Sequence, residues 1–300
     1  MPNSANHATR DLAGDIARNL VNDVSFLVSP PDICVRVFDL IDSDTASTAE
    51  IGEVISSDPS LTARLLRLVN SSYYNLSRKV ETVSRAITLV GVRELYSLIL
   101  AVSAIRTFSS LPAALVNMDT FWRHGLFTGL IARNLARRVR VLHPERLFVA
   151  GLLHDIGHLV LYSRLPEVMQ EIVLVSGGDE GLQHQAELSE LGFSHADLGG
   201  ALADVWNLPD PLCAAISYHH IPGCAIEQAA LESAIVHLAE VLANRSQIGA
   251  YCENPNPEEP IDPAVWDILG LDPDAFDAEE IMGEAGVQFT DTASLLLARA

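Results

Sequence analysis

The residues best placed to do chemistry are the adjacent pair His154 and Asp155, in the segment GLLHDIG at 151–157. Imidazole and carboxylate groups together suit Zn²⁺, Fe²⁺ or Mn²⁺, and a carboxylate can bridge two such ions. Neighbouring residues of a helix point about 100° apart, so the pair needs ligands from other segments. Side chains of the right type occur on both sides of it in the chain: His124, His195, His219, His220 and Glu240. The sequence therefore predicts a site for one or two divalent ions.

Each candidate also has a purely structural interpretation. His124 lies in an apolar segment, where a hydrogen-bonded core histidine is the commoner role. His154 and the histidines at 219–220 stand near the ends of predicted helices, where the helix dipole favours them. His195 could serve only to start a helix, and His237 could pair with Glu240, three residues away. These explanations are weaker jointly, because buried imidazoles and carboxylates usually need one another or a metal.

The segments that carry these residues are predicted to be helical. Ser47 and Glu50 form a capping-box pattern, in which each side chain bonds the backbone amide of the other residue. Asp58 is an N-cap followed by proline at the first helical position, and the apolar residues after it repeat every three to four residues. Gly91 separates an apolar helix at 83–90 from a second at 92–105. Alternating strand patterns and a GxxxxGK phosphate loop do not occur, so the predicted fold class is all-α, a multi-helix bundle.

Composition narrows the classes of function. The formal net charge of −20 opposes direct nucleic-acid binding, because phosphate contacts need clustered lysine and arginine. The basic cluster at 133–140 is short and is interpreted as a solvated helix face. Four scattered cysteines without a CxxC pair are typical of reduced thiols in the cytosol. No apolar run reaches the ~18 residues of a membrane span, and residues 1–10 do not resemble a secretory leader, so we expect a soluble, cytoplasmic protein with no membrane contact.

Four segments are predicted along the chain. Residues 1–24 form an N-terminal helix or extension, and 25–110 a helical subdomain with little candidate chemistry. Residues 111–245 form a second helical subdomain, and nine of the ten histidines lie beyond residue 120. Residues 246–300 are an acidic loop and helices packing on the bundle, with short helices expected at 263–269, capped by Asp262, and near 272–276. Tyrosines at 73–74 are expected to seal the gap between the subdomains, the alternative being a partner-binding face.

Several motifs follow one another in an order typical of a known family. Residues 58–74 read DPSLTARLLRLVNSSYY and residues 86–95 read AITLVGVREL. They are followed by FWRH at 121–124, GLLHDIG at 151–157, HADLG at 195–199, YHH at 218–220 and HLAE at 237–240. Over roughly residues 25–245 the chain thus resembles the HDOD domain, a bacterial signalling module related to the HD metal-dependent phosphohydrolases. The resemblance implies an N-terminal HDOD subdomain packed on an HD-like subdomain.

The resemblance also implies a ligand series H…HD…H…HH…D, as in the HD-GYP phosphodiesterases of cyclic di-GMP. This sequence supplies the whole series except the last residue, with Glu240 where aspartate is expected. The extra methylene moves the carboxylate oxygens, whereas metal–ligand distances must hold within about 0.2 Å. His158 occupies a position that is often lysine in HD-GYP enzymes, and the GYP motif after the histidine pair is missing. His143, His158 and His184 are interpreted as structural.

Three functions remain open. The first is a non-catalytic signalling adaptor that binds other signalling proteins and retains an HD-type site for Fe, Zn or Mn. The second is a metal-dependent phosphohydrolase of cyclic dinucleotides or nucleotides, with Asp155 as the catalytic residue. The third is a module that binds a nucleotide second messenger without hydrolysis. Few cations lie near the motifs, namely Arg123, Arg164 and the cluster at 133–140. Because phosphate chemistry needs such cations, the sequence favours the adaptor.

Overall fold

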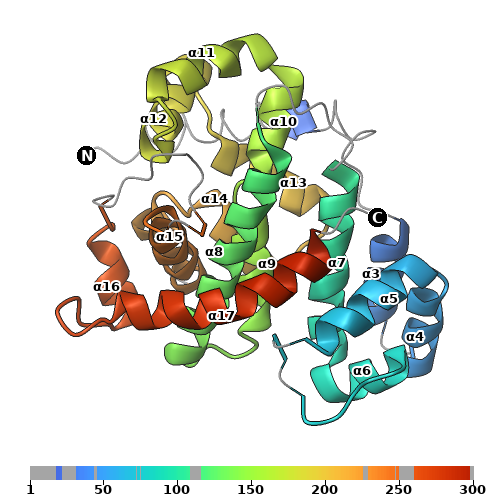
Figure 1. Ribbon diagram of the computed structural model, residues 1–300. Helices are drawn as coiled ribbons and strands as arrows, with labels where there is room; N and C mark the ends of the chain where they lie inside the picture. The colour runs from blue at the N-terminus through green and yellow to red at the C-terminus, as the bar shows by residue number, and fades with distance from the viewer. Residues whose placement is uncertain are drawn as a thin grey trace.

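A computed structural model describes residues 18–21, 32–43, 46–71, 73–74, 76–108, 116–225, 229–246, 248–249 and 260–297. Every regular element within those ranges is a helix, and the helices pack in several directions around a shared core (Figure 1). The predicted all-α class is therefore confirmed. The predicted extension at 1–24, apart from residues 18–21, and the boundary near residue 111 lie outside the described residues.

The helices before residue 110 follow the predicted caps. They are α3 (Asp32–Asp42), α4 (Thr48–Ser56), α5 (Pro59–Val69), α6 (Val83–Val90) and α7 (Val92–Phe108). Ser47 completes the predicted capping box with Glu50, and the Asp58 carboxylate accepts from the Leu61 amide at 2.9 Å. Gly91, at φ 97°, ends α6 where the chain bends by 117° into α7. Among the described residues, no single helix is long and apolar enough to cross a membrane; only this bent pair, taken together, reaches the required length and hydropathy.

The second half is built around one long central helix, α8 (Met118–Arg138), which is buried along most of its length. The helices that follow are α9 (Glu145–Leu153), α10 (Ile156–Arg164), α11 (Pro166–Ser176), α12 (Glu180–Leu191), α13 (His195–Val205), α14 (Asp210–Ser217), the 3₁₀ turn η1 (Pro222–Cys224) and α15 (Ala230–Asn244). The helices α9 and α15 both pack on α8 (Figure 1). This arrangement sets the ends of several helices around one point of the core.

Two close helix crossings fix the position of the His–Asp pair. A Cβ atom at Gly151 of α9 would lie 2.7 Å from the Gly129 Cα of α8, so glycine is required for the two backbones to touch. A Cβ atom at Gly157 of α10 would lie 1.9 Å from the carbonyl oxygen of His195, at the start of α13. Because the pair lies between Gly151 and Gly157, these crossings bring it against both α8 and α13.

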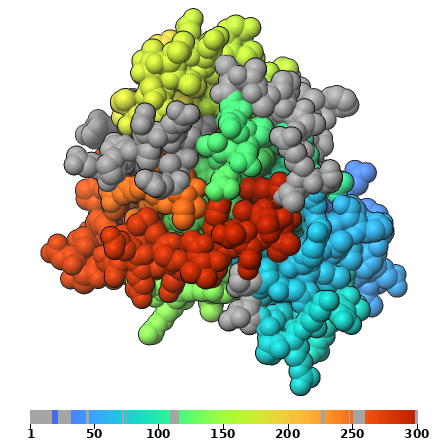
Figure 2. Space-filling model, viewed as in Figure 1, coloured from blue at the N-terminus to red at the C-terminus, as the bar shows by residue number. Residues whose placement is uncertain are grey.

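The C-terminal segment contains a long helix that the sequence did not reveal. After α16 (Ala264–Leu269), with Asp262 accepting from the Ala264 amide as expected, the segment 272–276 forms a turn rather than the predicted short helix. It leads into α17 (Ala278–Leu296), which Figure 2 shows in red as a band across one face. Phe289 of α17 packs edge-on against Phe127 of α8, and α17 also contacts α5.

The basic cluster at 133–140 is only partly the solvated face that was predicted. The side chain of Arg133 is fully buried, with its guanidinium 3.7 Å from the centre of the Tyr73 ring and its Nη2 donating to the Tyr73 carbonyl at 2.8 Å. Arg137 remains nearly half exposed. Tyr73 also packs on Phe148 of α9, so the tyrosine seals the first half against the second, as expected. The contact between the Arg133 guanidinium and the face of the Tyr73 ring offsets part of the cost of burying this arginine.

Candidate metal centre

The structure brings all seven predicted candidates into one buried cluster. They come from α8, the α9–α10 junction, the start of α13, the segment after α14, and α15: His124, His154, Asp155, His195, His219, His220 and Glu240. All are at most 2% exposed except His220, whose side chain is 10% exposed. Residues separated by more than a hundred positions in the chain therefore lie together in one region that is shielded from solvent.

His154 and His219 do bond carbonyls in the last turns of α9 and α14, as expected of histidines near helix ends, but the explanation of His195 as a helix start does not hold in the structure. Asp155 stands at the N-cap position of α10, yet its side chain makes no capping hydrogen bond. At the start of α13 the cap is Ser194, which forms a capping box with Asp197, so His195 is not needed there. The carboxylate and the imidazole are both directed into the cluster instead.

Three imidazoles are oriented by the same kind of hydrogen bond. The Nδ1 atom of each bonds a backbone carbonyl: His124 to Gly249 at 2.6 Å, His154 to Gly151 at 2.7 Å and His219 to Ile216 at 2.6 Å. A carbonyl oxygen can only accept, so Nδ1 carries the proton and Nε2 presents a lone pair. His195 is held likewise, its Nδ1 donating to the Glu187 carboxylate at 2.7 Å. This second contact is the one that typically orients a metal-binding histidine.

The Nε2 atoms oriented in this way point at one another. They lie 3.3 Å apart between His124 and His154, and 3.4 Å apart between His195 and His219. Two lone pairs at these distances repel unless a cation lies between them. Burial, reinforced by neighbouring histidines, lowers the pKa of His154 and His219 well below the usual value. The rings of His154 and His219 are therefore neutral at pH 7, which is the metal-binding form, and the donor set fits a divalent metal.

Asp155 divides the imidazoles into two groups. Its Oδ2 lies 3.3 Å from the His154 Nε2 and 3.6 Å from the His124 Nε2, a group we call subsite A. Its Oδ1 lies 3.4 Å from the His195 Nε2 and 3.9 Å from the His219 Nε2. These two histidines and His220, whose Nε2 is 2.9 Å from that of His195, form subsite B. One carboxylate facing two imidazole groups is the arrangement that can bridge two ions.

Glu240 enters the cluster beside subsite B. Its carboxylate lies 4.0 Å from the His219 Nε2 and 3.7 Å from the His220 Nδ1. The alternative pairing of Glu240 with His237 does not occur. The His237 Nδ1 donates to the His219 carbonyl at 2.7 Å, and its Nε2 accepts from the Asp262 amide at 3.0 Å. His237 thus ties α15 to the histidine segment and to the chain before α16.

Three residues of the cluster were missed from the sequence. Glu180 and Glu187 of α12 are buried, and so is His158, which was interpreted as structural. The His158 Nε2 lies 3.9 Å from Asp155, and its Nδ1 lies 3.2 Å from Glu187. Burial raises the pKa of Glu187, but His195 and His158 outweigh it and lower that pKa overall. Glu187 therefore carries a negative charge that holds two imidazoles in place.

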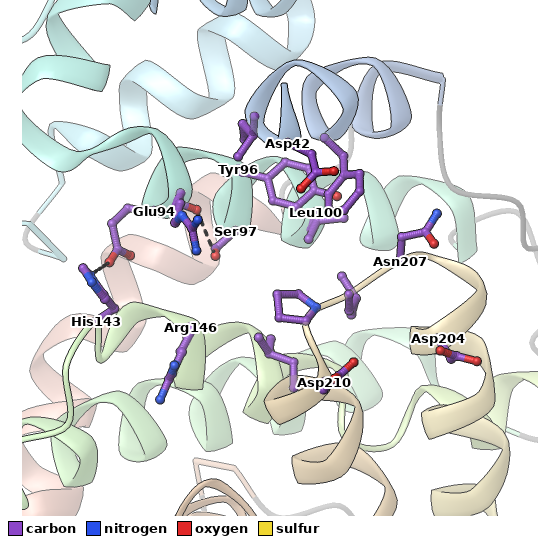
Figure 3. A pocket seen from close by; sticks show the side chains of 16 residues that line it. Asp42, Glu94, Tyr96, Ser97, Leu100, His143, Arg146, Asp204, Asn207 and Asp210 are labelled. Atoms are coloured by element: carbon purple, nitrogen blue, oxygen red, sulfur yellow. Dashed lines mark hydrogen bonds and ion pairs between the residues drawn. The ribbon is translucent and has the colours of Figure 1, made fainter. Parts of the chain in front are cut away.

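A separate hollow of about 510 Å³ lies away from the cluster, between α3, α7, α9 and the α13–α14 connection (Figure 3). In it the Glu94 Oε1 lies 3.6 Å from the His143 Nδ1. Burial, followed by the nearby Glu145 carboxylate, raises the pKa of Glu94 to about 8. None of the seven candidate residues lines this hollow, so it is distinct from the candidate metal centre.

The helical bundle and its buried histidines around a His–Asp pair place this chain among candidate metal-binding proteins. The chain belongs to the HDOD domain family, whose sequence profile matches residues 27–222. An uncharacterized protein of Treponema pallidum (strain Nichols) is 29% identical over 214 residues, which make up 71% of this chain. The match spans only 40% of that relative's length.

Solved structures agree with this assignment. The crystal structure of an HDOD domain protein of unknown function from Geobacter sulfurreducens has a TM-score of 0.74 and 27% identity, covering 95% of this chain and 97% of that one. A candidate phosphohydrolase from Shewanella amazonensis SB2B has a TM-score of 0.68 and 24% identity, covering 92% and 97%. The second likeness is evidence for the fold alone.

Proposed function

We propose that this chain is a regulatory HDOD protein that binds a divalent metal in its buried cluster and acts on other signalling proteins without hydrolysing a phosphoester. The convergence of oriented Nε2 atoms around Asp155 carries the metal part of the proposal. A bound divalent ion supplies charge and Lewis acidity at that point. In an adaptor, the same ion serves to hold together the helices that deliver its ligands.

The surroundings of the cluster support a non-catalytic role. Phosphoryl transfer needs preorganised cationic donors for the charge that develops in the transition state. Arg133 is committed to Tyr73, and the Arg123 guanidinium lies over the Phe289 ring at 4.9 Å. His158 stands where HD-GYP enzymes often have lysine, and its Nδ1 faces Glu187. Of the cations that the sequence places near the motifs, Arg123 and Arg133 therefore have other partners.

A second candidate function is a metal-dependent phosphohydrolase. The observation that favours it is the Asp155 carboxylate facing both imidazole groups, since paired ions are common in phosphoester hydrolysis. In this function Asp155 would hold the ions and the imidazoles would complete their coordination. The two functions differ in turnover, which a direct assay measures.

The test is an assay of cyclic di-GMP and generic phosphoester hydrolysis, with Mn²⁺ or Fe²⁺ added. We expect the wild-type protein to hydrolyse both at background rate, because metal binding alone does not position a nucleophile in line. Two variants loaded with the same metal accompany it, Glu240→Asp and His154→Ala. Robust wild-type turnover that disappears in His154→Ala would make the adaptor proposal wrong. Activity that arises only in Glu240→Asp would identify a hydrolase scaffold disabled at one ligand.

A further inference from the structure

The helix α12 turns a polar face toward the core. Glu180, Gln183 and Glu187 are buried on that face, whereas Leu182 and Leu188 are 51% and 44% exposed. Such a reversal of the usual pattern is unfavourable unless the buried carboxylates meet positive or donor groups. Glu187 meets the His195 and His158 imidazoles. Glu180 lies on the same buried face of α12 and borders the same cluster. Its carboxylate therefore needs a comparable partner.

The Glu180 carboxylate is held at one oxygen and open at the other. Its Oε2 accepts from the Asn244 Nδ2 of α15 at 2.5 Å. Its Oε1 is buried and meets no hydrogen-bond donor, and the carboxyl group lies against that of Asp155. The side chain reaches subsite A, where its ligand atom and those of His124, His154 and Asp155 are all within 4.8 Å of one another, and it meets the same limit with Asp155, His158 and His195. Two carboxyl groups this close in a buried volume do not both stay ionised unless a cation lies between them, and such a cation would stabilise both charges.

We propose that Glu180, which is outside the motif series, is a metal ligand that completes subsite A. Subsite A then offers two imidazoles and two carboxylates, whereas subsite B offers three imidazoles and the second oxygen of Asp155. Carboxylates favour harder ions such as Mn²⁺, and imidazoles favour Zn²⁺. The two subsites therefore bind different metals, Mn²⁺ or Fe²⁺ at A and Zn²⁺ at B. This inference rests on the proposed metal binding and adds a ligand and a selectivity to it.

The assignment also accounts for the position of Glu240. This residue lies beside the subsite B histidines His219 and His220. The carboxylate of Glu180 on α12 thus stands in subsite A, while the Glu240 side chain on α15 lies beside His219 and His220 and also comes within 4.8 Å of His154. The replacement of the expected aspartate by Glu240 therefore leaves subsite A with its own pair of carboxylates.

The test measures metal stoichiometry in the full chain. Metal-free protein receives one equivalent of Zn²⁺ and an excess of Mn²⁺, is desalted, and its metals are quantified by mass spectrometry. We expect the wild type to retain one Zn²⁺ and one Mn²⁺, and Glu180→Gln to retain only the Zn²⁺. The matched control is Glu232→Gln, a buried glutamate of α15 that pairs with Arg146 instead. It should retain both ions, and circular dichroism checks that each variant is folded.

A milder variant keeps the test independent of folding defects. Asn244→Ala leaves Glu180 in place and removes its hydrogen-bond donor, so Mn²⁺ should bind about 10- to 100-fold more weakly in a chelator competition. Retention of both ions at wild-type affinity in Glu180→Gln or in Asn244→Ala would overturn the assignment. A wild type that holds one Zn²⁺ and no Mn²⁺ would also overturn it while leaving the proposed function intact. A wild type that binds neither ion would contradict the proposed function itself.

Discussion

The candidate imidazoles are each anchored through one nitrogen, and this anchoring decides what the cluster can do. Backbone carbonyls hold His124, His154 and His219, and a carboxylate holds His195. The remaining nitrogens have no freedom to turn away from one another. A cluster preorganised in this way binds a cation without first reorienting its ligands.

Glu187 is the residue whose removal tests this anchoring most simply. It accepts from both the Nδ1 and the backbone amide of His195, at 2.7 and 2.8 Å. Replacing Glu187 by Gln removes the charge that orients His195, so Zn²⁺ affinity should fall about 10- to 100-fold. A chelator competition measures it, with Glu190→Gln on the exposed face of α12 as the control. Equal affinities in the two variants would show that Glu187 does not position His195.

Glu94 gives the protein a predicted pH dependence. Its pKa is raised to about 8 by burial and by Glu145, against about 4.3 in an unfolded chain. Between those values the folded state binds more protons, so the contribution of Glu94 to stability falls as pH rises. The stability of Glu94→Gln relative to wild type should therefore increase from pH 5 to pH 8.5 in denaturant titrations. A difference that stays constant with pH would contradict this, and Glu53→Gln on the exposed face of α4 controls for the charge change.

The residues that could be identified from the sequence were those in the motif series. All seven lie in the cluster, because the ends of α9, α13 and α14 converge there against the interiors of α8 and α15. Glu180 and Glu187 were missed because the apolar face of a helix normally points inward, whereas α12 turns its polar face to the core. The available signal was that polar residues share one face at 180, 183 and 187, while the leucines at 182 and 188 lie outside it. His158 was missed because one histidine after a motif is more often structural.

At the scale of elements, the close crossing of α8 and α9 determines whether subsite A forms. His124 is on α8 and His154 follows α9 directly. The cap-based helix starts and the break at Gly91 could be predicted, because caps depend on local hydrogen bonds. Helices packing on the bundle were predicted for 246–300, but the bounds of α17 were not placed, although Ile281, Ala285 and Phe289 repeat at helical spacing on its buried face.

Replacing Gly151 by Ala tests the crossing. The new Cβ would meet the Gly129 backbone at 2.7 Å, and backbone cannot move aside as a side chain can. We expect a loss of about 1–3 kcal/mol in unfolding free energy and weaker metal binding, since α8 and α9 would separate. Gly283→Ala in α17, where a Cβ would meet nothing within 4 Å, is the control and should raise helix stability. Wild-type metal affinity in Gly151→Ala would show that the crossing does not control subsite A.

At the scale of the whole molecule, the two halves play different parts. The helices α3–α7 supply none of the cluster residues, and they meet the second half through Tyr73, Phe148 and Arg133. The division into subdomains at residue 111 stays a prediction. The formal charge of −20 opposes contact with nucleic acid, and contact with other signalling proteins stays a prediction.

The most direct measurement is the metal content of the full chain purified without chelator. We predict one or two equivalents of Fe, Zn or Mn per chain, and loss of most of it in Asp155→Ala, because that carboxylate faces both imidazole groups. The control Asp204→Ala, on the exposed face of α13, should keep the wild-type content. Substoichiometric metal in the wild type, equal to that in Asp155→Ala, would contradict the account and leave the cluster as a purely structural set of buried polar residues.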